Sequence, residues 1–137
     1  MPFKPFKDFL SAKTPLEQDS SGLEATHSAR LAVAALLWEM AHIDGSIDKE
    51  EFNAVIKALD HEFHLMDSDA VELVDIVDFL RRTNQQLERF IEEINASYNR
   101  EQRSHLVDLL WQIAESDGRI DRYEREFVQL IRNKLSL

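Results

Sequence analysis

The chain has 137 residues and no cysteine, and its 26 acidic side chains against 16 basic ones give a formal net charge of −10. A length of this order corresponds to about one domain, and a hydrophobic content of 44% is enough for a buried core. The acidic balance disfavours non-specific nucleic-acid binding and contact with an anionic membrane, because both require clustered cations. A multivalent cation or a basic protein partner is the expected counterpart. The lack of cysteine excludes disulfides and thiolate metal sites.

The sequence contains no segment that predicts a membrane span or a secretion signal. The N-terminal residues MPFKPFKDFL carry prolines and charges where a signal peptide requires an apolar stretch. The longest uninterrupted apolar run is Leu31 to Trp38, well short of the roughly 20 residues that span a bilayer. We therefore expect a cytoplasmic protein that meets a membrane, if at all, peripherally and through partners.

The first predicted element is a short helix from about Lys4 to Ala12. Phe3, Phe6 and Leu10 are spaced three and four residues apart, so they share one face of this helix. We expect this face to dock onto the domain, with contact to a membrane as the alternative. Residues Thr14 to Leu23 have the composition of a linker.

Helical spacing recurs along the rest of the chain and predicts six further helices. They are expected over Leu23 to Ile43, from Asp48 onward, over Asp67 to Arg82, around Leu87 to Tyr98, from Asn99 onward and from Asp121 onward. The first and fifth of these are apolar nearly all round, which is typical of buried central helices. The prediction is an all-α fold of about seven helices in a compact bundle, with residues 1–22 as N-terminal helix and linker and residues 23–137 as the helical domain.

Two segments of the chain are copies of one motif. LLWEMAHIDGSIDKEE at residues 36–51 and LLWQIAESDGRIDRYE at residues 109–124 share nine identical residues in sixteen ungapped positions. A duplicated helix–turn–helix unit explains this similarity. We expect two pseudo-symmetric repeats around the two central helices.

Helix geometry accounts for most of the motif. Each copy supplies a glycine for the left-handed end of one helix, an isoleucine that packs on the core, and an aspartate and a glutamate that form a capping box on the next helix. These residues are Gly45, Ile47, Asp48 and Glu51 in the first copy, and Gly118, Ile120, Asp121 and Glu124 in the second. Asp44 and Asp117 are not explained in this way, because a carboxylate near a helix C-terminus faces the negative end of the dipole.

The motif also resembles part of a calcium-binding loop, but the first ligand positions of such a loop would be Met40 and Ile113. Neither turn can therefore be a standard EF-hand. If pseudo-symmetry brings the two turns together, six carboxylates would repel one another unless a cation lies between them. They are Asp44, Asp48, Glu51, Asp117, Asp121 and Glu124. We call residues 44–51 and 117–124 the acidic turns, and a shared cation site and solvated helix caps remain the two alternatives.

Other candidate chemistry is sparse. His61 and His64 are three residues apart and could share a helix face, but they do not form the H-E-x-x-H zinc signature. An exposed helix end is the simpler interpretation, and His42 is a further candidate ligand beside the first acidic turn. No nucleophile–base pattern and no phosphate-binding glycine loop occur, so we expect no enzymatic activity. A metal-dependent hydrolase is the lowest-ranked alternative.

The paired motif A-x-x-D-G-x-I-D-x-x-E, each copy after an apolar helix containing tryptophan, resembles the TerB-like family over about residues 23–137. The resemblance implies an all-α domain of about seven helices and a divalent-metal site at the six carboxylates, for calcium, magnesium, manganese or zinc. Members are associated with tellurite resistance and stress-response operons, often in bacteria. The function implied is a stress-response interaction module with a protein partner, and the alternative is a metal-independent scaffold.

Overall fold

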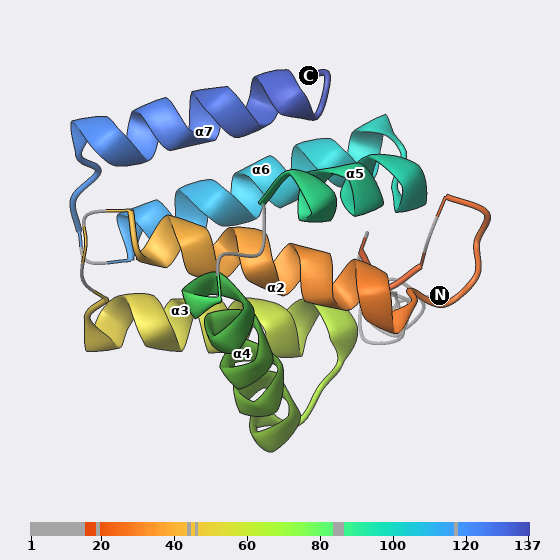
Figure 1. Ribbon diagram of the computed structural model, residues 1–137, viewed down its shortest axis with the longest axis horizontal. Helices are drawn as coiled ribbons and strands as arrows, with labels where there is room; N and C mark the ends of the chain where they lie inside the picture. Colours follow the sequence, from red (N-terminus) through yellow and green to blue (C-terminus); the bar gives the residue numbers. More distant parts are fainter. Residues whose placement is uncertain (1–15, 19, 44, 46, 84–86, 117) are drawn as a thin grey trace, which may run out of the picture.

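The computed structural model describes residues 16–18, 20–43, 45, 47–83, 87–116 and 118–137, and within them it is all-helical (Figure 1). The helices are α2 (His27–Ala41), α3 (Lys49–Phe63), α4 (Asp67–Arg82), α5 (Leu87–Ser97), α6 (Arg100–Glu115) and α7 (Arg122–Lys134). The predicted all-α fold is confirmed. The first of the seven predicted helices, at residues 4–12, lies outside the described residues.

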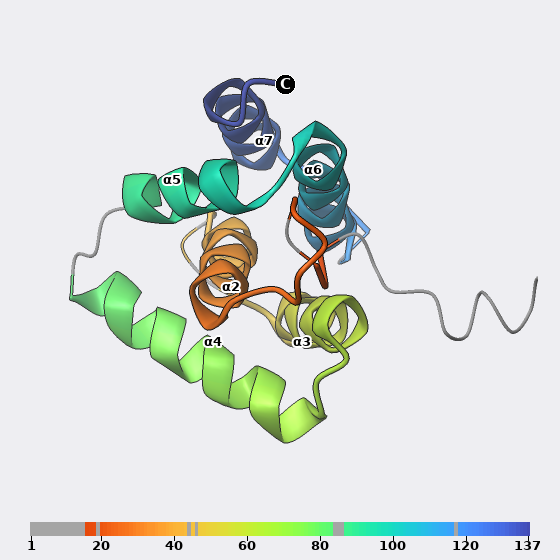
Figure 2. The same cartoon turned by 90° about the vertical axis from the view of Figure 1, so that its right-hand side faces the viewer.

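Helix α2 lies at the centre of the bundle and packs against α3, α4, α5 and α6 (Figures 1 and 2). Its run from Ala32 to Trp38 is buried without interruption, as the all-round apolar sequence predicts. The helix begins later than predicted, at His27 instead of Leu23. The Thr26 side chain accepts a hydrogen bond from the Ala29 N–H and caps the helix there, while Leu23 is 68% exposed.

The two copies of the motif are the pairs α2–α3 and α6–α7. Helices α2 and α6 pack against each other and run in the same direction, and α3 and α7 return along them (Figure 1). Both acidic turns are consequently at the same end of the molecule. Across the described residues, no helix combines the length and apolar character needed to cross a membrane.

Each acidic turn contains a glycine in the left-handed region. Gly45 has φ of 93° and Gly118 has φ of 86°. Their N–H groups donate to the carbonyl oxygens of His42 and Glu115, both at 2.9 Å, just beyond the ends of α2 and α6. A side chain other than glycine is strained at these angles, so the two glycines permit the tight change of direction between helices.

The glycine requirement gives a first prediction. Space around the missing Cβ of Gly118 is open, so Gly118→Ala should lose stability through backbone strain alone. We expect the free energy of unfolding in urea to fall by about 1–2 kcal/mol, and Gly118→Asn to lose less, because asparagine adopts the left-handed region more readily. Equal stability of Gly118→Ala and the native chain would contradict the explanation.

Candidate functional site

Both acidic turns contain a complete capping box. Asp48 Oδ1 accepts from the Glu51 N–H at 2.8 Å, and Glu51 Oε1 accepts from the Asp48 N–H at 3.3 Å. In the second turn the same two bonds join Asp121 and Glu124 at 2.8 and 3.0 Å. The predicted capping role of these four residues is confirmed, and it places each pair at the positive end of a helix.

The glutamates of the two boxes are buried, which the sequence motif did not indicate. Glu51 is 3% exposed and Glu124 is 5% exposed, whereas Asp48 is exposed and Asp121 half-buried. A buried carboxylate is costly unless polar groups compensate it. Here the backbone N–H groups and the dipole of the helix start provide compensation, so both glutamates are part of the structural framework of the turns.

The two turns are neighbours in space. Ile43, directly before the first turn, lines a surface hollow of about 250 Å³ together with Tyr123 and Phe127 of α7. The first turn therefore lies beside the helix that the second turn begins. Asp44 and Asp117 lie outside the described residues, so a cation shared between them stays a prediction.

The described carboxylates do not make a metal site by themselves. Within the described part of the chain, no group of three or more histidine, aspartate or glutamate side chains is placed to hold a metal ion. One oxygen of each carboxylate in the two capping boxes already accepts a backbone N–H. Carboxylate oxygen is the ligand that calcium and magnesium prefer, and the predicted ion site also includes Asp44 and Asp117, which lie outside the described residues.

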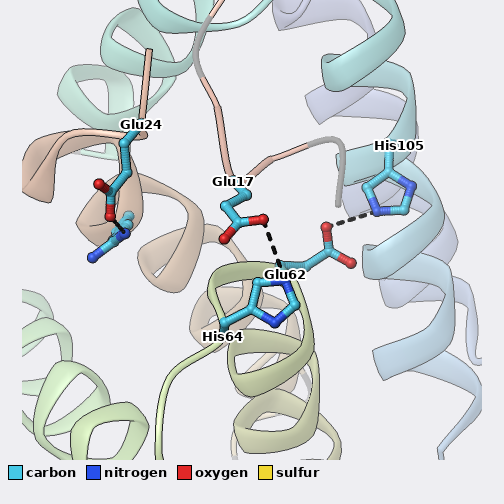
Figure 3. A network of polar contacts seen from close by, with 6 residues as sticks. Glu17, Glu24, Glu62, His64 and His105 are labelled. Atoms are coloured by element: carbon cyan, nitrogen blue, oxygen red, sulfur yellow. Dashed lines mark hydrogen bonds and ion pairs between the residues drawn. The ribbon is translucent and has the colours of Figure 1, made fainter. Parts of the chain in front are cut away.

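The three histidines singled out from the sequence have separate surroundings. His42 donates from Nδ1 to the Trp38 carbonyl oxygen at 3.0 Å and meets the Trp38 ring edge-on. His64 is at the left-handed C-terminal end of α3, and its Nε2 lies 3.2 Å from Glu17 Oε2 (Figure 3). His61 is exposed and lines a groove between α3 and α6. His61 and His64 thus form an exposed helix end, as predicted.

The structure reveals a hydrogen-bonded pair, formed by a buried glutamate and a half-buried histidine, that sequence reasoning missed. Glu62 is 1% exposed, and its Oε1 lies 2.9 Å from His105 Nε2 (Figure 3). The sequence does contain a signal that Glu62 is buried. Glu62 follows Leu59 by three residues and therefore lies on the apolar face of α3. No local pattern points to His105, because it is 43 residues away on another helix.

The pair lies in the wall of a groove of about 450 Å³ between α3 and α6, which we call the α3–α6 groove. The hydrogen bond to Glu62 raises the pKa of His105, as do the charges of Glu62 and Asp108, while burial acts in the opposite direction. An imidazole oriented by a carboxylate can transfer protons. None of the described residues lining the groove carries a hydroxyl or thiol.

The His105 pair predicts a pH dependence of stability. The pKa of His105 in the folded state lies above the ordinary value of 6.5. The pair therefore makes its full contribution to the free energy of unfolding below pH 6.5, and this contribution is lost as the pH rises through the folded-state pKa. Glu62→Gln should lower the pKa of His105, which NMR titration of the imidazole ring measures. The same variant should show a smaller decline of the unfolding free energy as the pH rises. Glu126→Gln, which alters an exposed pair with Arg122, serves as the control. An unchanged His105 pKa in Glu62→Gln would refute the assignment.

Comparison with known proteins yields one family. The model of the family described as tellurite resistance protein TerB matches residues 30–137. No curated protein and no solved structure matches the chain significantly. The match spans both copies of the motif and most of the chain, in agreement with the resemblance seen in the sequence. The chain belongs to the TerB family of tellurite resistance proteins.

Proposed function

We propose that the chain is a cytoplasmic interaction module of the tellurite-resistance-associated stress response, and that it binds a divalent cation at its two acidic turns. The observation that carries the proposal is the placement of the duplicated acidic motif at one end of the molecule (Figure 1). The ion would be calcium, magnesium, manganese or zinc. Asp44 and Asp117 would be its principal ligands, beside Asp48, Glu51, Asp121 and Glu124.

Electrostatics supports a cation at this end. The chain carries a formal net charge of −10, and each acidic turn contributes its carboxylates to the same region. The helix starts stabilise one aspartate and one glutamate in each turn, whereas Asp44 and Asp117 follow the ends of α2 and α6 in the sequence. Carboxylates near helix C-termini gain nothing from the dipole, and an ion that pairs with them would remove repulsion.

We propose α4 as the surface that meets a protein partner. Phe79 is 58% exposed, and the partly exposed Val71 and Ile76 lie on the same helix. The exposed carboxylates of Glu72 and Asp75 lie among them. Exposed apolar side chains bordered by negative charge suit a basic amphipathic segment of a partner protein. On this proposal the role of the chain is binding and not catalysis.

A metal-independent scaffold is the second candidate, and one observation favours it. Both capping boxes are completed by protein atoms alone, so the turns have a structural role without any ion. In that case the repeated carboxylates would be solvated helix caps and α4 would bind its partner regardless of metal.

Titration of the chelator-treated protein separates the two candidates. Calcium, magnesium, manganese and zinc are each added while the melting temperature and the amide shifts of Gly45 and Gly118 are recorded. With a shared site, at least one ion should raise the melting temperature and move both glycine signals together, because ligand binding to the folded state stabilises it. If none of the four ions changes the melting temperature or the amide shifts, the shared metal site is excluded and the metal-independent scaffold is the remaining candidate.

The ligands are tested by Asp44→Asn combined with Asp117→Asn. This double variant should lose the metal response while retaining the helical fold. The matched control is Asp75→Asn combined with Asp108→Asn, which removes the same charge from exposed positions outside the turns and should respond to metal as the native chain does. A double variant that is more stable in chelator yet still responds to metal would exclude the shared site.

A further inference from the structure

The α3–α6 groove is a hollow among the described residues that neither acidic turn explains. Its volume is about 450 Å³, and it is lined by Ala54, Ala58, Leu109 and Ile113 together with polar side chains that include His61 and Gln112. Leu109 and Ile113 are buried and belong to the core, so the groove has an apolar floor. His61 and Gln112 are exposed and form part of its rim. A groove of this type suits the apolar face of a helix.

The chain enters the described part of the structure at one end of this groove. Leu16 is 0% exposed, and its carbonyl oxygen accepts from the Tyr98 hydroxyl at 3.0 Å. The next two residues contact the two helices that form the groove. Glu17 pairs with His64 at the C-terminal end of α3, and the Gln18 carbonyl oxygen accepts a hydrogen bond from the side chain of Gln102 on α6.

His64 and Gln102 are each one helical turn from a groove residue. Three residues before His64 lies His61, and three residues after Gln102 lies His105. Figure 3 shows Glu17 and His64 close to the Glu62–His105 pair. Leu16, the first described residue, is thus close in sequence to contacts at one end of the groove.

We propose that the N-terminal segment of the same chain, residues 3–12, docks in the α3–α6 groove as a helix. Phe3, Phe6 and Leu10 would lie on the apolar floor. From Phe3 to Leu10 is seven residues, or about 10 Å of helix, and the same length of α3 separates Ala54 from His61. The apolar stripe of the segment therefore matches the groove in length.

Tethering favours this occupant. Because the segment is joined to the groove by a few residues, its effective concentration is on the order of millimolar, so weak docking suffices. The exposed apolar side chains of α4 are the competing surface. Helix α4 itself lies on the opposite side of α3 from α6 (Figure 2).

The chain has no native cysteine, so a single spin label can be attached through Lys4→Cys. Docking predicts that the amide signals of Ala58, Leu109 and Ile113 lose most of their intensity, while those of Val128 and Ile131 on α7 keep theirs. In the labelled chain that also carries Phe6→Ser and Leu10→Ser, the groove signals should recover. These substitutions lie outside the buried core of the described helices, so the fold is expected to persist, which the unchanged α7 signals would verify.

Three results would overturn the proposal. Full intensity at the groove signals in the labelled chain would mean that the segment does not dock there. Loss of intensity at Ile76 and Phe79 would place it on α4 instead. A spin-labelled chain mixed with an unlabelled isotope-enriched chain tests the third possibility, because groove broadening in that mixture would make a second copy the occupant.

Discussion

The fold depends on covering α2, a helix that is apolar on nearly every side. Leu36, Leu37 and Met40 are completely buried, and α3, α4, α5 and α6 all contact this helix. Truncation of one such leucine to alanine typically costs about 2–5 kcal/mol, a large share of the stability of a domain of this size. Since α2 cannot be stable in water alone, the other helices are arranged around it, and the position of the acidic turns follows from that arrangement.

The duplication places the two turns together because the two central helices run in the same direction. Each turn must end a central helix, reverse the chain and start an outer helix within a few residues. Glycine at positive φ and the capping box meet these requirements in both copies. The buried Glu51 and Glu124 show that this local solution is also part of the core, which couples the geometry of each turn to the packing of the bundle.

Local periodicity was sufficient to predict the helical architecture, the buried course of α2 and the roles of Asp48 and Asp121, because these features depend on residues within one or two turns of each other. It failed for the start of α2, where the cap at Thr26 outweighed the apolar pattern that extends to Leu23. The Glu62–His105 pair was missed since it joins two helices distant in sequence. The burial of Leu16 within a segment that has the composition of a linker was missed for the same reason, as its partner is Tyr98.

An acidic chain can fold around buried carboxylates only if each of them is compensated. Glu51 and Glu124 are compensated by helix starts and Glu62 by the imidazole of His105. Compensation of the Glu62 charge depends on the protonation of His105, whereas the N–H groups at the helix starts are available at every pH. Asp44 and Asp117 lie outside the described residues, and in the sequence both follow the C-terminus of a central helix, where the dipole does not stabilise a carboxylate. If these two carboxylates lie close together, as the proposed cation site requires, a bound ion would relieve their repulsion, so they are the positions at which metal binding should be tested first.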